Sequence, residues 1–142
     1  MSQDKFYEHK VQYYETDQMQ VVHHSNYIRW FEEARVFMLE HYNCNYDKLE
    51  AMGIISPVLS VNAEYKSMTR FGETVQIETK VTKYNGIKFS IEYIIKDKET
   101  GKVRCTGETK HCFLNKHNVP MSLKRSYPQI HQLFEAMNAG NA

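Results

Sequence analysis

The sequence predicts an α+β fold in which an antiparallel β-sheet wraps around one buried helix. A strand-like run at residues 5–14 precedes a helix-like run, and four further strand-like runs follow, separated by short turn signals. With 142 residues, the chain is expected to form a single domain, residues 1–142. A chain of this length buries about two-thirds of its unfolded surface without help from disulfides.

The long helix is the element on which the others are expected to pack. It should begin at Ser25 or Asn26, since both residue types are good N-caps, and end near residues 41–45. Its apolar residues recur at three-and-four spacing, which predicts a largely buried helix. One face carries Tyr27, Phe31, Ala34, Met38 and Tyr42, and a neighbouring stripe carries Ile28, Arg35 and Leu39.

The remaining elements follow from alternation and turn residues. Residues 46–52 predict a short helix closed by Gly53, and extended structure should start at Pro57. Asn85-Gly86 predicts a two-residue hairpin turn, and Tyr127-Pro128 opens a final amphipathic helix before a polar tail that should fray. Alternating residues mark the four strands: Leu59, Val61, Ala63 and Tyr65; Val75, Ile77, Thr79 and Val81; Phe89, Ile91, Tyr93 and Ile95; Val103, Cys105, Gly107, Thr109, His111 and Phe113.

Composition excludes several classes of protein. Eighteen Lys and Arg against 17 Asp and Glu give a formal charge of +1, so no nucleic-acid partner is expected. Three cysteines at unrelated spacings, and no apolar run like a signal peptide, lead us to expect a cytoplasmic protein. A helix needs about 20 apolar residues to cross a bilayer, and no apolar run in the sequence is close to that length. Stable membrane insertion is therefore not expected.

A candidate catalytic site lies between the first strand and the long helix. Asp17 is in a loop just before residues 21–26, where the backbone N–H groups of a helix N-terminus can stabilise an oxyanion. A carboxylate facing such a site is a minimal hydrolytic apparatus, although a loop aspartate can also simply form a turn or a cap. The sequence has no G-x-S-x-G motif and no cysteine with a histidine partner, so a serine or cysteine acyl-enzyme is not expected.

No metal or other cofactor is expected either. His23 and His24 are adjacent, so in an extended loop their side chains should point apart. The spacing of the other histidines and the cysteines matches no zinc motif.

Residues 14–27 read Y-E-T-D-x-x-x-V-V-x-H-x-N-Y and are followed by F-E-x-A-R at 31–35. This run resembles the active-site segment of the hotdog-fold thioesterases of the 4-hydroxybenzoyl-CoA thioesterase family, especially the Tol-Pal-associated acyl-CoA thioesterases. Residues 56–65 are similar to the family's strand after the long helix, so the resemblance covers nearly the whole chain. It implies a hotdog fold that pairs edge to edge as a homodimer or homotetramer, and an acyl-CoA thioester hydrolase that needs no cofactor.

The resemblance also assigns roles to residues. Asp17 matches the catalytic carboxylate, His24 matches the residue whose backbone N–H or ring polarises the thioester carbonyl, and Tyr13 matches a tyrosine lining the site. The alternative readings are capping or packing for His24 and packing for Tyr13. The residues expected to contact substrate are Gln20, Val22, Tyr27 and Lys88; Lys66 and Arg70 are further candidates for the CoA phosphates, whereas Arg35 is expected in a structural ion pair or carbonyl contact.

Two positions depart from the family pattern. Glu15 stands where aspartate is usual, and Gln20 stands where glycine is common before the Val-Val pair. Glycine would permit a positive φ there, so Gln20 could strain the loop or intrude on the thioester, which bears on efficiency and acyl preference.

Several alternatives stay open at this point. Asp17 can act as general base or as nucleophile through a mixed anhydride. The rival functions are a non-catalytic module that binds acyl-CoA or acyl-carrier protein, and a dehydratase acting on β-hydroxyacyl thioesters.

Overall fold

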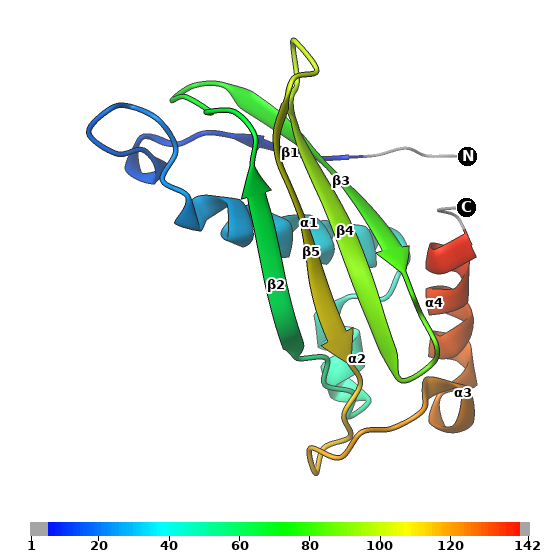
Figure 1. The fold of residues 1–142 in the computed structure, drawn as a ribbon. Helices are drawn as coiled ribbons and strands as arrows, with labels where there is room; N and C mark the ends of the chain where they lie inside the picture. Colours follow the sequence, from blue (N-terminus) through cyan, green and yellow to red (C-terminus); the bar gives the residue numbers. More distant parts are fainter. Residues whose placement is uncertain (1–5, 140–142) are drawn as a thin grey trace.

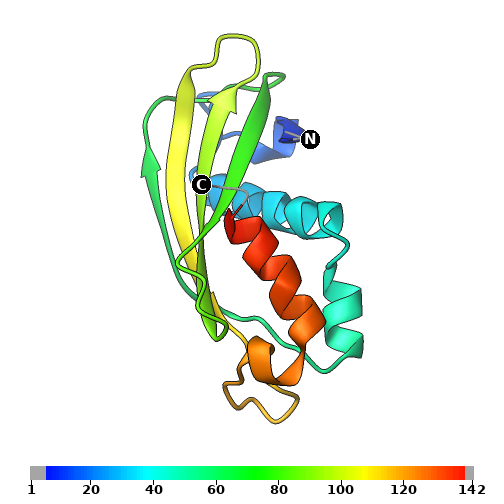
Figure 2. The same ribbon diagram turned by 90° about the vertical axis from the view of Figure 1, so that its right-hand side faces the viewer.

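The computed structural model describes residues 6–139, which form a five-stranded antiparallel sheet with all helices on one face (Figures 1 and 2). The α+β prediction is therefore confirmed. In chain order the elements are β1 (Tyr7–Lys10), the 3-10 turn η1 (Tyr13–Glu15), α1 (Ser25–His41), α2 (Tyr46–Ala51), β2 (Val58–Tyr65), β3 (Thr74–Thr82), β4 (Lys88–Asp97), β5 (Val103–Cys112), α3 (Leu123–Ser126) and α4 (Pro128–Ala139).

Helix α1 crosses the sheet and buries the predicted apolar face against it (Figure 2). Phe31 stacks on Tyr93 of β4 with ring centroids 4.4 Å apart. The close approach depends on Gly107 of β5, because a Cβ there would lie 2.5 Å from the Phe31 ring. Ile28 was expected near the buried face, but it is 40% exposed, so that part of the prediction is wrong.

Strand β2 does not pair with β3, its neighbour in sequence. The strand order is β1-β3-β4-β5-β2, with Tyr65 of β2 opposite Cys105 of β5 (Figure 1). The connection over residues 66–73 passes from this edge to the start of β3 and meets the loop that carries Asp17. There Val21 forms a β-bridge with Arg70, and the Val22 N–H donates to the Thr69 carbonyl at 2.8 Å.

Several predicted boundaries need correction. The first strand is limited to β1 and gives way to η1; Lys5, its predicted start, lies outside the described residues. The β3–β4 connection spans residues 83–87 rather than a two-residue turn, because Asn85 Oδ1 accepts hydrogen bonds from the N–H groups of Ile87 and Lys88.

The C-terminal part of the chain packs beside α1. Helix α4 confirms the predicted final helix, whereas α3 was not predicted. Phe134 of α4 packs on Phe89 and Phe113, with ring centroids 5.1 and 5.0 Å away. The predicted frayed tail includes residues 140–142, which lie outside the described part of the chain.

Arg35 is buried, and in the part of the chain that the structure describes it has neither the predicted ion pair nor a carbonyl contact. Its Nε donates to the Tyr46 hydroxyl at 2.8 Å, and Nη1 donates to the Tyr93 hydroxyl at 3.3 Å. The Tyr93 hydroxyl continues through Thr109 to His111 Nε2, in steps of 2.7 Å. Tyrosine hydroxyls therefore solvate this cation beneath α1.

None of the helices described between residues 6 and 139 combines the length and apolar character required to span a bilayer.

Candidate active site

Residues 16–22 form a tight loop that carries Asp17 in front of α1. A β-bridge between Thr16 and Val22 closes the loop, and the Asp17 N–H donates to the Val21 carbonyl at 2.9 Å. Gln20, at the turn, has φ of +64°. A glycine would adopt this conformation without strain, so the expected positive φ at position 20 is confirmed. The intrusion of Gln20 on the thioester stays a prediction.

Asp17 is exposed, and its carboxylate is sparsely bonded. Oδ1 accepts a hydrogen bond from the Met19 N–H at 2.8 Å, and within residues 6–139 no other group donates to either oxygen. The second oxygen is free to accept a proton or to attack a carbonyl carbon.

Glu15, two residues earlier, anchors the loop from below. Its buried carboxylate accepts hydrogen bonds from Trp30 Nε1 at 2.9 Å, the Gln12 N–H at 2.8 Å and His9 Nε2 at 2.8 Å. Burial acts to raise the Glu15 pKa, but the bonds from Gln12, His9 and Trp30 together hold that pKa below its ordinary value. Glu15 thus ties β1, η1 and α1 together as an anion.

The Glu15 backbone also organises the start of α1. Its carbonyl accepts from the His23 N–H and from Asn26 Nδ2, both at 2.9 Å. The prediction that Ser25 or Asn26 caps the helix is wrong, because His24 is the N-cap and already has helical φ and ψ of −57° and −27°. Asn26 is instead a buried helix residue whose side chain bonds to the backbone of Glu15, which links the helix to the residues before the loop.

Within residues 6–139, three of the N–H groups at this helix start have acceptors and one has none. The Ser25 N–H donates to His23 Nδ1 at 3.2 Å, the Asn26 N–H to the His23 carbonyl at 3.0 Å, and the Tyr27 N–H to the His24 carbonyl at 3.3 Å. The His24 N–H has no acceptor among the described residues. It is the backbone donor available to an oxyanion.

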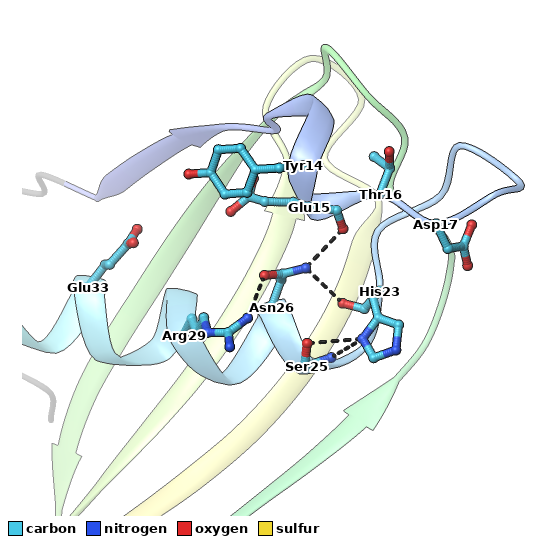
Figure 3. Close-up of a pocket in the computed structure, with 9 residues that line it drawn as sticks. All are labelled: Tyr14, Glu15, Thr16, Asp17, His23, Ser25, Asn26, Arg29 and Glu33. Atoms are coloured by element: carbon cyan, nitrogen blue, oxygen red, sulfur yellow. Dashed lines mark hydrogen bonds between the residues drawn. The ribbon is translucent and has the colours of Figure 1, made fainter.

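A cavity of about 400 Å³ opens between the loop and the outward face of α1 (Figure 3). Arg29 is held at its wall by a hydrogen bond from Nη1 to Asn26 Oδ1 at 3.1 Å. Carboxylate, imidazole, hydroxyl and guanidinium groups therefore surround one space. The lining residues are Tyr14, Glu15, Thr16, Asp17, His23, Ser25, Asn26, Arg29 and Glu33.

Asp17 is the one residue of the predicted site that lines this cavity. The His24 ring does not line the cavity and lies 6.1 Å from the Tyr65 ring. Tyr27 is buried beside it and donates its hydroxyl to Thr69 Oγ1 at 3.0 Å. Tyr13 is 73% exposed and packs edge-on against Phe71.

The other predicted contacts are more scattered. Val22 is buried, and Gln20 is exposed at the turn of the loop. Lys88 opens β4 at the end of the sheet opposite the loop, about 30 Å away along the strand (Figure 1). Within one chain the structure does not bring Lys88 to Asp17.

Of the other two basic candidates, one lies beside the loop. Lys66 is paired with Glu64 at 2.9 Å. Arg70 is exposed, bridges Val21 through its backbone, and its guanidinium has no partner among the described residues. Of the basic candidates, Arg70 is therefore the one whose backbone pairs with the loop that carries Asp17.

The sequence-based reasoning missed His23 and Arg29 as cavity residues. His23 was overlooked because the loop was taken as extended up to residue 25, whereas the helical backbone at His24 turns the two histidine rings face to face, 4.3 Å apart. The prediction that these rings point apart is wrong. Arg29 lies three residues after Asn26, on one helical face, and that spacing could have identified it.

The described residues contain no group of three or more His, Cys, Asp or Glu placed to hold a metal ion. All three cysteines are free and buried. Burial raises the pKa of Cys44 to about 11 and that of Cys105 to about 12, so neither thiol is ionised at neutral pH.

A model of the Thioesterase-like superfamily matches residues 11–128. Bacillus subtilis (strain 168) YneP, provisionally named an acyl-CoA thioesterase, is 32% identical over 127 residues, which are 89% of this chain and 91% of YneP. The crystal structure of a DHNA-CoA thioesterase from Staphylococcus aureus is 34% identical, with a TM-score of 0.88 over 96% of this chain and 91% of that one. A 1,4-dihydroxy-2-naphthoyl-CoA thioesterase from Synechocystis shares the fold at 17% identity, with a TM-score of 0.82 over 94% of this chain and 95% of that one.

Proposed function

Because the chain belongs to the Thioesterase-like superfamily and has its hotdog fold, we propose that it hydrolyses acyl-CoA thioesters, with Asp17 as the catalytic carboxylate. The single observation that carries the residue assignment is the free second oxygen of Asp17, in a cavity beside the start of α1. The named relatives support the reaction class. The narrower placement among Tol-Pal-associated members stays a prediction.

In the proposed reaction an oxygen nucleophile adds to the thioester carbonyl carbon, and the carbonyl π electrons move onto oxygen. The His24 N–H and the positive end of the α1 dipole stabilise that oxyanion. When the tetrahedral intermediate collapses, the C–S bond breaks and CoA leaves as a thiolate. Asp17 is either the base that takes the proton of attacking water or the attacking carboxylate itself. In the second route the acyl group stays on Asp17 as a mixed anhydride until water adds to it, which releases the carboxylic acid and restores the Asp17 carboxylate.

The rival function is a hotdog module that binds acyl-CoA or acyl-carrier protein without cleaving it. Gln20 is the feature that favours it, because a side chain stands at a positive-φ position where glycine is common in the family. Turnover by the unmodified chain separates the two functions.

We also propose that two copies pair through β2. This edge strand is exposed along most of its length and carries large apolar side chains at Val58, Leu59, Val61 and Tyr65. Pairing would satisfy its free backbone groups and cover these side chains. Light scattering after gel filtration should give twice the chain mass or a multiple of that, and Val61→Lys should shift the distribution toward monomer; a monomeric unmodified chain would contradict the proposal.

The remaining parts of the proposal concern the surroundings of the reaction. The whole chain, residues 1–142, acts as one hotdog domain in the cytoplasm, and Arg70 contributes to binding of the CoA phosphates. Val22, Tyr27 and Gln20 border the acyl group, with Tyr13 at the periphery. Lys88 could reach CoA only from a second copy, given its place at the far end of β4.

The test is free-thiol release from a panel of short, long and aromatic acyl-CoAs, including 1,4-dihydroxy-2-naphthoyl-CoA. The unmodified chain should cleave at least one, and Asp17→Asn should lower kcat/KM at least about 100-fold. Asp47→Asn, an exposed carboxylate in the first turn of α2, is the matched control and should change nothing. Equal turnover by the Asp17→Asn variant would refute the assignment.

A further inference from the structure

The two adjacent histidines at the start of α1 stack on each other, with ring centroids 4.3 Å apart, but they differ in their other contacts. His23 lines the cavity that contains Asp17 (Figure 3), whereas the His24 ring also lies 6.1 Å from the Tyr65 ring. The His23 backbone is fixed at both ends, because its N–H donates to the Glu15 carbonyl at 2.9 Å and its carbonyl accepts from the Asn26 N–H at 3.0 Å. The Cα from which the His23 ring extends is therefore held in place.

The hydrogen bonds of His23 also determine where its ring hydrogen lies. The Ser25 N–H points at Nδ1 from 3.2 Å, and the Ser25 hydroxyl lies 2.9 Å from the same atom. A backbone N–H can only donate, so Nδ1 must accept and carries no hydrogen. In this geometry the imidazole is neutral with its hydrogen on Nε2, and no group among the described residues accepts from Nε2.

The site has few hydrogen-bond donors for an oxyanion, and the hydrogen on His23 Nε2 would add one. Among the described residues the His24 N–H is the one free backbone donor at the helix start, because those of Ser25, Asn26 and Tyr27 are all bonded. An oxyanion formed by acyl transfer is typically bound by preorganised donors acting together. One N–H alone leaves room for a second donor on the cavity side.

We propose that His23 is a catalytic residue whose neutral imidazole donates a hydrogen bond from Nε2 to the thioester oxygen. The inference rests on the proposed function and extends it to a second donor beside the His24 N–H. No proton leaves His23: the π electrons move onto the carbonyl oxygen as the new C–O bond forms, the Nε2–H bond to that oxygen strengthens, and the electrons return as the C–S bond breaks. In the general-base route, the proton that Asp17 takes from water passes to the thiolate sulfur or to solvent.

Two substitutions separate the ring nitrogen that accepts from Ser25, Nδ1, from the ring nitrogen that is left to donate, Nε2. In His23→Asn, Oδ1 takes the place of Nδ1 and can still accept from the Ser25 N–H, but the Nε2 donor is gone. In His23→Gln, the amide NH2 reaches toward the position of Nε2, while the acceptor for Ser25 is lost. His117→Asn, at an exposed histidine of the loop after β5, is the matched control.

The experiment measures kcat, KM and thermal unfolding of these variants on the best acyl-CoA of the panel. We expect His23→Asn to lower kcat about 100-fold with little change in KM or melting temperature, and His23→Gln to recover at least about tenfold of that loss. His117→Asn should match the unmodified chain. Deuterium exchange at the Ser25 N–H reports whether His23→Asn keeps the cap.

Three results would overturn the proposal. Full turnover by His23→Asn would leave the ring only as an acceptor for Ser25. Turnover by His23→Gln as slow as that of His23→Asn would exclude hydrogen-bond donation. A larger loss in His24→Gln than in His23→Asn would assign the donor to the other ring. The proposed function fails separately, through retained turnover in Asp17→Asn.

Discussion

Glu15 and Asp17 lie two residues apart, yet their carboxylates are in opposite environments. The Glu15 carboxylate is buried and accepts from His9, Gln12 and Trp30. The Asp17 carboxylate is exposed and accepts from the Met19 N–H alone within the described residues. One acid is saturated with donors, and the other keeps a free oxygen.

The difference teaches which carboxylate can react. A buried carboxylate surrounded by donors is held ionised and in place, and burial keeps it from water and from a carbonyl carbon. The exposed carboxylate of Asp17 is open to both, and Glu15 keeps the loop of Asp17 against α1 through its carbonyl bonds to His23 and Asn26. We therefore assign fixation to Glu15 and chemistry to Asp17.

The largest expected effect on stability comes from removing the Glu15 carboxylate. Glu15→Ala leaves Trp30 Nε1 and the Gln12 N–H without their acceptor, so the free energy of unfolding should fall by about 3 kcal/mol. Asp17→Ala should change it by less than about 0.5 kcal/mol. Urea unfolding of both variants checks this, and equal losses would remove the distinction between the two acids.

A smaller effect is expected from deleting one donor to Glu15. Trp30→Phe keeps the buried ring but loses the Nε1–H, which should cost about 2 kcal/mol for a bond to a charged group. Tyr84→Phe is the matched control, since it removes a hydroxyl that bonds His131 Nδ1 at 2.6 Å beside α4. Only Trp30→Phe should speed deuterium exchange at the His23 N–H, and equal exchange in both variants would contradict the anchoring role of Glu15.

Acid should test the charge on Glu15. Its pKa is lowered in the folded protein, so the stability that it contributes is present above the ordinary carboxyl pKa of about 4.3 and is lost as the pH falls through the folded value. Below pH about 4.3 the unfolding free energy of Glu15→Gln should therefore fall less steeply than that of the unmodified chain, by up to about 1 kcal/mol per pH unit. Parallel slopes in urea titrations would show that the carboxylate is not held ionised.

The smallest effect concerns the loop itself. Gln20→Gly relieves a positive φ, which stabilises the folded state, but glycine also has greater freedom in the unfolded chain. The net gain in the free energy of unfolding should be about 0.5 kcal/mol. Lys83→Gly, at φ of +54° in the β3–β4 connection, is the control for the same relief far from Asp17. A change in acyl preference confined to Gln20→Gly would show that this side chain touches substrate.

Much of the fold could be predicted from the sequence, because its signals are local. Apolar spacing identified the sheet-facing side of α1, and alternation identified the inward face of β4. The pairing of β2 with β5 could not be predicted in this way, since it depends on how residues 66–73 cross the fold. The two-residue turn at Asn85-Gly86 failed because the Asn85 side chain organises a longer connection.

Only the part of the site that lies within the sequence motif could be predicted. Asp17 and the helix start were identified, but the N-cap is His24, one residue earlier than predicted, and His23 lines the cavity. The anchoring by Glu15 depends on His9 and Trp30, six and fifteen residues away, in a pattern that no local rule provides. Arg35 was misjudged because hydroxyl groups on α2 and β4 replace the expected ion pair.

The measurement that tests the account most directly compares Asp17→Asn with Glu15→Gln for both thiol release and urea unfolding. We predict that Asp17→Asn loses at least about 100-fold in kcat/KM while its stability changes by less than about 0.5 kcal/mol, and that Glu15→Gln is less stable but keeps turnover within about tenfold. The opposite pattern, with Asp17→Asn active and Glu15→Gln inactive at full stability, would contradict the division of roles between the two carboxylates.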